Sequence, residues 1–266
     1  MLKNLTRTTT ALALLLGFGA VSAQASVLML DVGGNGAYTG NNSPGHAAGA
    51  IASGYTTWAQ PNASGVTSVT DSDGNSIDVE FGRASTASNT ETGTFLFSQT
   101  PSAVSASGTS GIWDTDLTTD AFRGHSSASR DPVAIRLKGF APGEYTLFVA
   151  AHYAGNLNVP LDLYYEVSDD AGFNKLSDLT SFATGVTPDG DANSWTEGSD
   201  YVRIDFTITS TSDYLYFAAN DPVFESGSAS LSSVQIVPEP ASLALMGLGG
   251  AMMLVRRRNR PAKSLA

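Results

Sequence analysis

Oxygen-bearing side chains at every second position mark one segment that could hold a divalent cation. Asp189, Asp191 and Asn193 offer carboxylate and amide oxygens, and residues 71–75 repeat the same Asp-x-Asp-x-Asn pattern. Calcium takes about six to eight such ligands. Neither segment has the glycine and the final glutamate that an EF-hand loop adds. Calcium is one interpretation of Asp189, Asp191 and Asn193, and an Asx turn is the other, whereas residues 71–75 are better explained as a hairpin turn.

Three tryptophans, Trp58, Trp113 and Trp195, lie near segments that we expect to be loops. An exposed tryptophan is a flat apolar platform with a polar edge, and such a platform stacks well on a sugar ring. A tryptophan in a small β domain is also a common core residue. The three residues are therefore candidate glycan contacts, with burial in the core as the alternative.

Catalytic chemistry has little support in the sequence. The histidines His46, His125 and His152 stand in no metalloprotease motif, and no Gly-x-Ser-x-Gly nucleophile turn is present. The absence of cysteine excludes a disulfide scaffold, a thiolate metal site and a cysteine nucleophile. We expect a protein that is not an enzyme and needs no cofactor. The alternative is a secreted glycan-active enzyme with a carboxylate pair about 5–9.5 Å apart.

The charge is unevenly placed along the 266 residues. The chain has a net charge of −11, and residues 26–237 hold 7 basic against 24 acidic side chains, a net of −17. Nucleic-acid binding needs basic clusters, so the composition argues against it. Only 15% of residues are charged and 42% are hydrophobic, which is enough for a packed core.

Alternation of apolar and polar residues dominates the middle of the chain and predicts β-strands. Residues 202–209 are a clear case, with apolar side chains at even positions and polar ones at odd positions. Residues 143–153 are apolar on both faces, which indicates a central strand. The further expected strands are 27–31, 66–70, 77–81, 93–97, 133–138, 161–167, 214–219 and 230–236, and the one short helix expected is 117–122. We therefore expect an all-β fold, a single antiparallel β-sandwich like a jelly roll, over residues 26–236.

The first 25 residues have the order of a secretory signal peptide. A basic start precedes an apolar run at residues 11–20, which is too short to span a bilayer. Ala23 and Ala25 are the small residues that signal peptidase requires before the cleaved bond. We expect a signal peptide helix over residues 1–25 and export through the inner membrane.

The other end has three parts: Pro238, Glu239 and Pro240, then apolar residues 241–255, then Arg256, Arg257 and Arg258. The apolar stretch predicts a short transmembrane helix, and the arginines would stay on the cytoplasmic side. The body would then face outward, with residues 261–266 as a cytoplasmic tail.

This three-part end resembles the PEP-CTERM sorting signal of Gram-negative bacteria, here over residues 237–260. The resemblance implies recognition by an exosortase, cleavage near the Pro-Glu-Pro, and release or transfer to the cell surface. Proteins with this signal typically come from bacteria that make exopolysaccharide and biofilm. The membrane contact through the helix would be transient.

A second resemblance concerns the body. Residues 137–145 are similar to the strand–turn–strand motif of secreted fibronectin-like and galactose-binding-like β-sandwiches, which implies a fold and suggests carbohydrate binding. The sequence thus predicts an exported surface or matrix protein, with exopolysaccharide as its candidate ligand. A calcium-stiffened adhesin is a further alternative.

Overall fold

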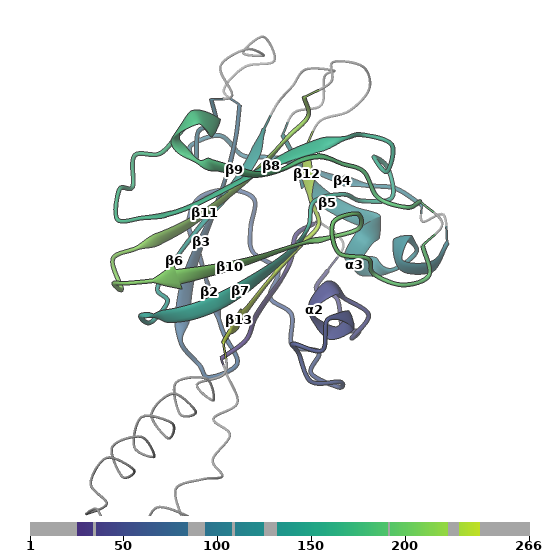
Figure 1. Ribbon diagram of the computed structural model, residues 1–266, viewed down its shortest axis with the longest axis horizontal. Helices are drawn as coiled ribbons and strands as arrows, with labels where there is room; N and C mark the ends of the chain where they lie inside the picture. Colours follow the sequence, from purple (N-terminus) through teal and green to yellow (C-terminus); the bar gives the residue numbers. More distant parts are fainter. Residues whose placement is uncertain are drawn as a thin grey trace, which may run out of the picture.

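The computed structural model describes residues 26–33, 36–84, 94–107, 110–124, 132–190, 192–222 and 229–239 (Figure 1). The strands are β1 (Leu28–Asp31), β2 (Thr67–Thr70), β3 (Ser76–Arg83), β4 (Ser102–Ser105), β5 (Asp120–Arg123), β6 (Val133–Lys138), β7 (Gly143–Ala150), β8 (Leu161–Ser168), β9 (Thr180–Val186), β10 (Val202–Ile208), β11 (Tyr214–Asn220), β12 (Ser230–Leu231) and β13 (Ser233–Pro238). The helices are short: α2 (Pro44–Ala47), α3 (Asp116–Thr119), and the 3-10 turns η1 (Gly111–Trp113) and η2 (Leu176–Asp178).

Two antiparallel sheets make up the sandwich. The four-stranded sheet has the order β1-β13-β7-β10, and the six-stranded sheet has the order β2-β3-β6-β11-β8-β9. A third sheet, β12-β5-β4, has three strands. In Figure 1, β7, β10 and β13 cross in front of β2 and β3, and α2 and α3 lie to the right. The structure confirms the expected all-β antiparallel sandwich.

Alternation along the strands builds the core between the two main sheets. In β10 the burial alternates without a break, with Ile204, Phe206 and Ile208 inside and the residues between them exposed. The six-stranded sheet contributes the opposite wall, for example Phe81 and Leu137. Burying one face of each sheet in this way removes its apolar side chains from water, which is the main force that holds the layers together.

Strand β7 is buried on both faces, as its composition predicts. Leu147 and Val149 point into the core between the sheets, while Phe148 and Ala150 point into a second core on the other side. This second core covers part of the outer face of the four-stranded sheet. Its wall comes from the segments around α2, η1 and residues 192–201.

The turn between β6 and β7 matches the strand–turn–strand pattern of residues 137–145. Gly139 has φ 113°, a conformation that side chains disfavour. A Cβ atom there would lie 2.7 Å from the carbonyl oxygen of Ser76. Glycine is therefore needed at this turn for two reasons, backbone conformation and space.

Some expected elements were wrong. The helix expected at 117–122 ends at Thr119, and Asp120 begins β5, because Ala121 and Phe122 are buried by pairing with β4 and β12. The serine-rich residues 102–105 form β4, and residues 180–186 form β9, neither of which was expected. Residues 94–97 make only isolated bridges, one of them between Arg83 and Leu96. Within the described ranges, no helix has the length and apolar character needed to cross a membrane.

Candidate functional site

The last strand of the sandwich contains the start of the Pro-Glu-Pro segment. Strand β13 lies between β1 and β7, and its pairing with β1 ends where Ile236 faces Leu28. Pairing with β7 continues to Pro238, and the backbone N–H of Glu239 donates to the carbonyl of Glu144 at 2.9 Å. The expected boundary at residue 236 therefore falls inside a strand. Pro238 and Glu239 are held on the sandwich along one edge.

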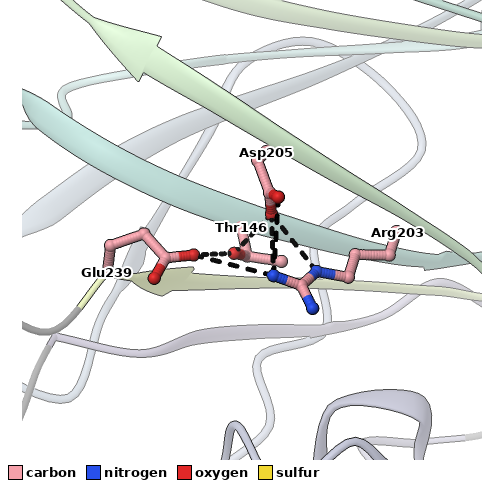
Figure 2. A network of polar contacts seen from close by, with 4 residues as sticks. All are labelled: Thr146, Arg203, Asp205 and Glu239. Atoms are coloured by element: carbon pink, nitrogen blue, oxygen red, sulfur yellow. Dashed lines mark hydrogen bonds and ion pairs between the residues drawn. The ribbon is translucent and has the colours of Figure 1, made fainter.

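The carboxylate of Glu239 lies on the outer face of the four-stranded sheet, among polar side chains of β7 and β10 (Figure 2). The hydroxyl of Thr146 lies 2.5 Å from Glu239 Oε1 and 2.9 Å from Asp205 Oδ1. The Arg203 guanidinium contacts Asp205 at 3.1 Å and reaches Glu239 Oε1 at 3.9 Å. These four residues, Thr146, Arg203, Asp205 and Glu239, are called the β13 clasp below.

The β13 clasp has fewer hydrogen-bond donors and positive charges than its two carboxylates could use. Two carboxylates face one hydroxyl, which has a single proton to donate, and one guanidinium, so the formal charge is −1. The side chains of Arg203 and Asp205 are 42% and 64% exposed, and that of Glu239 is 28% exposed. Solvent therefore weakens the ion pairs, and Glu239 is the most covered of the charged members.

Sequence reasoning found Glu239 but not its partners. Thr146 is the one polar residue within the apolar run of β7, and Arg203 and Asp205 stand at outward positions of a strand that the alternation predicts. That signal places the three side chains on an outer face. Their meeting with Glu239 depends on β7 lying between β10 and β13 in one register, which no local pattern specifies.

The outer face of the six-stranded sheet carries a shallow groove of about 180 Å³. Five of its lining residues lie on the neighbouring strands β3, β6 and β11, and the sixth directly precedes β2: Asp78, Glu80, Arg136, Lys138, Tyr214 and Val66. Asp78, Lys138 and Tyr214 stand opposite one another across β3, β6 and β11. The groove therefore combines an aromatic ring with carboxylates and cations at fixed spacing.

Contacts within the groove hold its side chains in place. Arg136 Nε donates to Glu80 Oε2 at 2.8 Å, and its guanidinium lies 4.4 Å from the centre of the Phe97 ring. Lys138 Nζ donates to the Tyr214 hydroxyl at 3.2 Å and lies 4.5 Å from the centre of that ring. Val66 beside them is 60% exposed, although it is apolar. Such a surface offers both donors and acceptors to a polyhydroxyl ligand, with apolar contact next to them.

The three tryptophans do not form exposed platforms. Trp58, Trp113 and Trp195 are 7%, 0% and 8% exposed and belong to the second core. Each indole N–H has a protein acceptor: the carbonyl of Gly40 for Trp58, the carbonyl of Asp189 for Trp113, and the side chain of Asn42 for Trp195. Their rings therefore serve packing, which corrects the expectation that they contact glycan.

Residues 71–75 form the expected hairpin turn between β2 and β3. Asp71 Oδ1 accepts from the backbone N–H groups of Asp73 at 3.0 Å and Asn75 at 2.8 Å. The Asn75 amide also donates to Asp71 Oδ2. These are the contacts of an Asx turn, so the oxygens of Asp71 are engaged by the turn itself.

The second segment is only partly described. Asp189 and Asn193 are exposed, and the Asp189 N–H donates to the carboxylate of Asp200, while Asp191 lies outside the described residues. Among the residues that are placed, no group of three His, Cys, Asp or Glu side chains is arranged to hold a metal ion. Calcium at Asp189, Asp191 and Asn193 stays a prediction.

Two of the histidines have structural contacts. His152 is buried, and its Nε2 lies 2.8 Å from the carbonyl of Val159. Burial lowers the pKa of His152 to about 4, although this hydrogen bond acts against the shift. His46 lies between the hydroxyl of Ser43 and the carbonyl of Tyr55. His152 is thus a neutral packing residue.

Several expected site residues lie outside the described part of the chain. These are Ala23, Ala25, Pro240, Arg256, Arg257, Arg258 and His125. The signal peptide, the C-terminal apolar helix and the cleavage positions therefore remain predictions from the sequence.

Comparison with solved structures gives weak similarities, among them to two CBM35 domains. The Bacillus subtilis protein YXIM is 15% identical over 80% of this chain, with a TM-score of 0.36, and this chain spans 40% of its length. A CBM35 domain of Cellvibrio japonicus Abf62 is 11% identical, with 60% of this chain and 92% of that one covered and a TM-score of 0.30. A Xyl-CBM35 solved with a glucuronic acid-containing disaccharide is 12% identical, with 52% and 87% covered and a TM-score of 0.30. Scores of this size transfer neither ligand nor activity.

No curated protein matches the sequence. Residues 237–259, in contrast, match the family model of the PEP-CTERM protein-sorting motif. That range begins inside β13 and includes Pro238 and Glu239. The chain carries a PEP-CTERM protein-sorting motif, which implies an exported protein sorted by an exosortase.

Proposed function

We propose that the protein is a non-catalytic component of the cell surface or extracellular matrix, and that its sandwich binds exopolysaccharide. Signal peptidase removes residues 1–25, the C-terminal helix anchors the chain briefly in the membrane, and an exosortase cleaves near Pro238-Glu239-Pro240. The sandwich then reaches the surface. No metal or organic cofactor is part of this proposal.

The observation that carries the proposal is the groove on the six-stranded sheet. Tyr214, Lys138 and Asp78 stand side by side across three strands, and the Arg136–Glu80 pair lies next to them. Carboxylates accept hydrogen bonds from sugar hydroxyls, and the cations donate to them. The groove is open and small, which suits single residues along a polymer better than a ligand that must be engulfed.

Binding can be tested with the protein isolated from the producing organism and that organism's own exopolysaccharide in affinity electrophoresis. We expect saturable retardation of the wild-type protein, and an affinity about tenfold lower for Tyr214→Ala, because the variant loses the apolar contact and the anchor of Lys138. Tyr55→Ala is the matched control, since Tyr55 is partly buried against the second core, away from the groove. Its affinity should equal that of the wild type.

Other results would contradict parts of the proposal. Equal retardation of Tyr214→Ala and wild type would remove the groove from the binding site, and no retardation of the wild type would remove polysaccharide binding altogether. Loss of binding in the presence of a chelator would mean that a metal ion takes part in binding. New reducing ends in the polysaccharide would favour the glycan-active enzyme instead.

A further inference from the structure

We infer that the folded sandwich restrains its own processing, because the β13 clasp and the exosortase compete for Glu239. The inference rests on the proposed exosortase cleavage near Pro238-Glu239-Pro240 and concerns its regulation. The contacts that restrain Glu239 come from Thr146 of β7 and Arg203 of β10, both far from it in the sequence.

The backbone is the first point of competition. Enzymes that cut a peptide chain must reach its backbone and the flanking side chains in a cleft of their own. In this chain, Pro238 pairs with Tyr145 and the Glu239 N–H donates to the carbonyl of Glu144. On its other edge, the pairing of β13 with β1 has already ended at Ile236. The strand end must leave β7 before an active site can enclose it.

The side chain is the second point of competition. The Glu239 carboxylate is the one charged group of the Pro-Glu-Pro segment, so it is the feature that an enzyme reads by polar contacts. In the folded protein it is only 28% exposed and shares the Thr146 hydroxyl with Asp205. An enzyme that binds this carboxylate must first displace Thr146 from it.

The restraint slows cleavage but does not prevent it. Only the last two residues must detach, with one backbone hydrogen bond and the clasp contacts, while Val237 stays paired with β7 and residues 233–236 stay paired on both sides. The apparent affinity of a partner falls by the fraction of molecules in the competent state. Removing a hydrogen bond to a carboxylate should therefore raise the detached fraction and the cleavage rate about fivefold.

The β13 clasp also predicts a change in the opposite direction. Asp205 competes with Glu239 for the hydrogen bond from the Thr146 hydroxyl. It also lies closer to the Arg203 guanidinium than Glu239 does, at 3.1 Å against 3.9 Å. Asp205→Asn removes a like charge beside Glu239 and frees the guanidinium. Glu239 should then be held more tightly, and cleavage should slow by about twofold.

The experiment follows full-length precursor in cells that contain the exosortase, by pulse labelling and the mass change on cleavage. We expect faster conversion for Thr146→Val, slower conversion for Asp205→Asn, and an unchanged rate for Thr207→Val, a matched substitution at an exposed threonine of β10. Thermal unfolding of each variant is the second readout. A melting temperature close to that of the wild type shows that faster cleavage does not come from global unfolding.

The outcomes distinguish a failure of the proposed restraint from a failure of the proposed cleavage. If Thr146→Val is cleaved at the wild-type rate or more slowly, or if Thr146→Val and Asp205→Asn shift the rate in the same direction, the restraint is wrong. If the wild-type precursor is never converted in cells with the exosortase, then the proposed cleavage fails instead.

Discussion

Replacing Trp113 by alanine should lower the free energy of unfolding by about 3–5 kcal/mol, the largest single effect that we expect in this protein. Trp113 is fully buried, and its ring lies 5.8 Å from that of Trp195 in an edge-on arrangement. Its indole N–H donates to the carbonyl of Asp189 at 2.8 Å. The variant therefore loses apolar burial and aromatic contact, and it also loses the side-chain hydrogen bond that joins η1 to Asp189.

Chemical denaturation of wild type and variant measures this loss. Val66→Ala is the control, because Val66 is 60% exposed and its change should stay within about 0.5 kcal/mol. A loss below about 1 kcal/mol for Trp113→Ala would mean that the second core contributes little to stability. It would also reopen the question of what the tryptophans do.

The second large effect concerns Asp31, at the end of β1. Burial, together with repulsion by Asp120, raises the pKa of Asp31 to about 7, while the hydrogen bond from the Tyr38 N–H lowers it and Asp116 raises it further. Asp31 Oδ2 accepts this bond at 2.6 Å, whereas Oδ1 is buried and has no hydrogen-bond partner among the residues that the structure describes. A charged Asp31 is therefore poorly accommodated.

The sign of the pH effect follows from which state holds the proton. Between pH 3.8 and about 7, folded Asp31 is protonated and unfolded Asp31 is not, so its contribution to stability falls as the pH rises through this window. His152 acts in the opposite sense, because folded His152 stays neutral down to about pH 4 and unfolded His152 takes up a proton below pH 6.5. The two contributions offset each other between about pH 4 and 6.5.

Asp31→Asn should expose this balance. We expect the stability difference between variant and wild type to grow in favour of the variant by about 2–4 kcal/mol from pH 4 to pH 8. Unfolding by denaturant at several pH values, in chelator so that no cation neutralises the carboxylates, measures it. Asp114→Asn, at an exposed position before α3, is the control and should run parallel to the wild type. If the stability of Asp31→Asn also ran parallel to that of the wild type across this pH range, the raised pKa of Asp31 would be wrong.

The sequence predicts the sandwich well where one strand carries its own signal. Residues 202–209 alternate without a break, and β10 has that burial pattern. The signal fails for β4 and β5, where Ser102–Ser105 has no apolar stripe and Asp120–Arg123 follows a helical turn. Those strands form because a third sheet pairs them, and pairing between distant segments leaves no local pattern.

The candidate sites also differ in how far a local sequence pattern predicts them. The Pro-Glu-Pro segment is local in sequence and was found there, but Thr146 and Asp205 reach it only through the register of three strands. For the tryptophans, the sequence identifies the residues but not their role. Their type is suited to sugar stacking and to packing alike, and only the placement of η1 and its neighbouring loops over the four-stranded sheet decides for packing.

The position of β13 between β1 and β7 has a mechanical consequence. In the proposed anchored state, with the C-terminal helix in the membrane and the sandwich bound to a polymer, tension would enter the domain at Glu239 and run lengthwise along β13. Hydrogen bonds of antiparallel strands lie perpendicular to that direction, so they are loaded together in shear and do not open one after another. In that state the tether would pull on a strand that is paired on both sides up to Ile236, and the domain would bear load until the proposed cleavage.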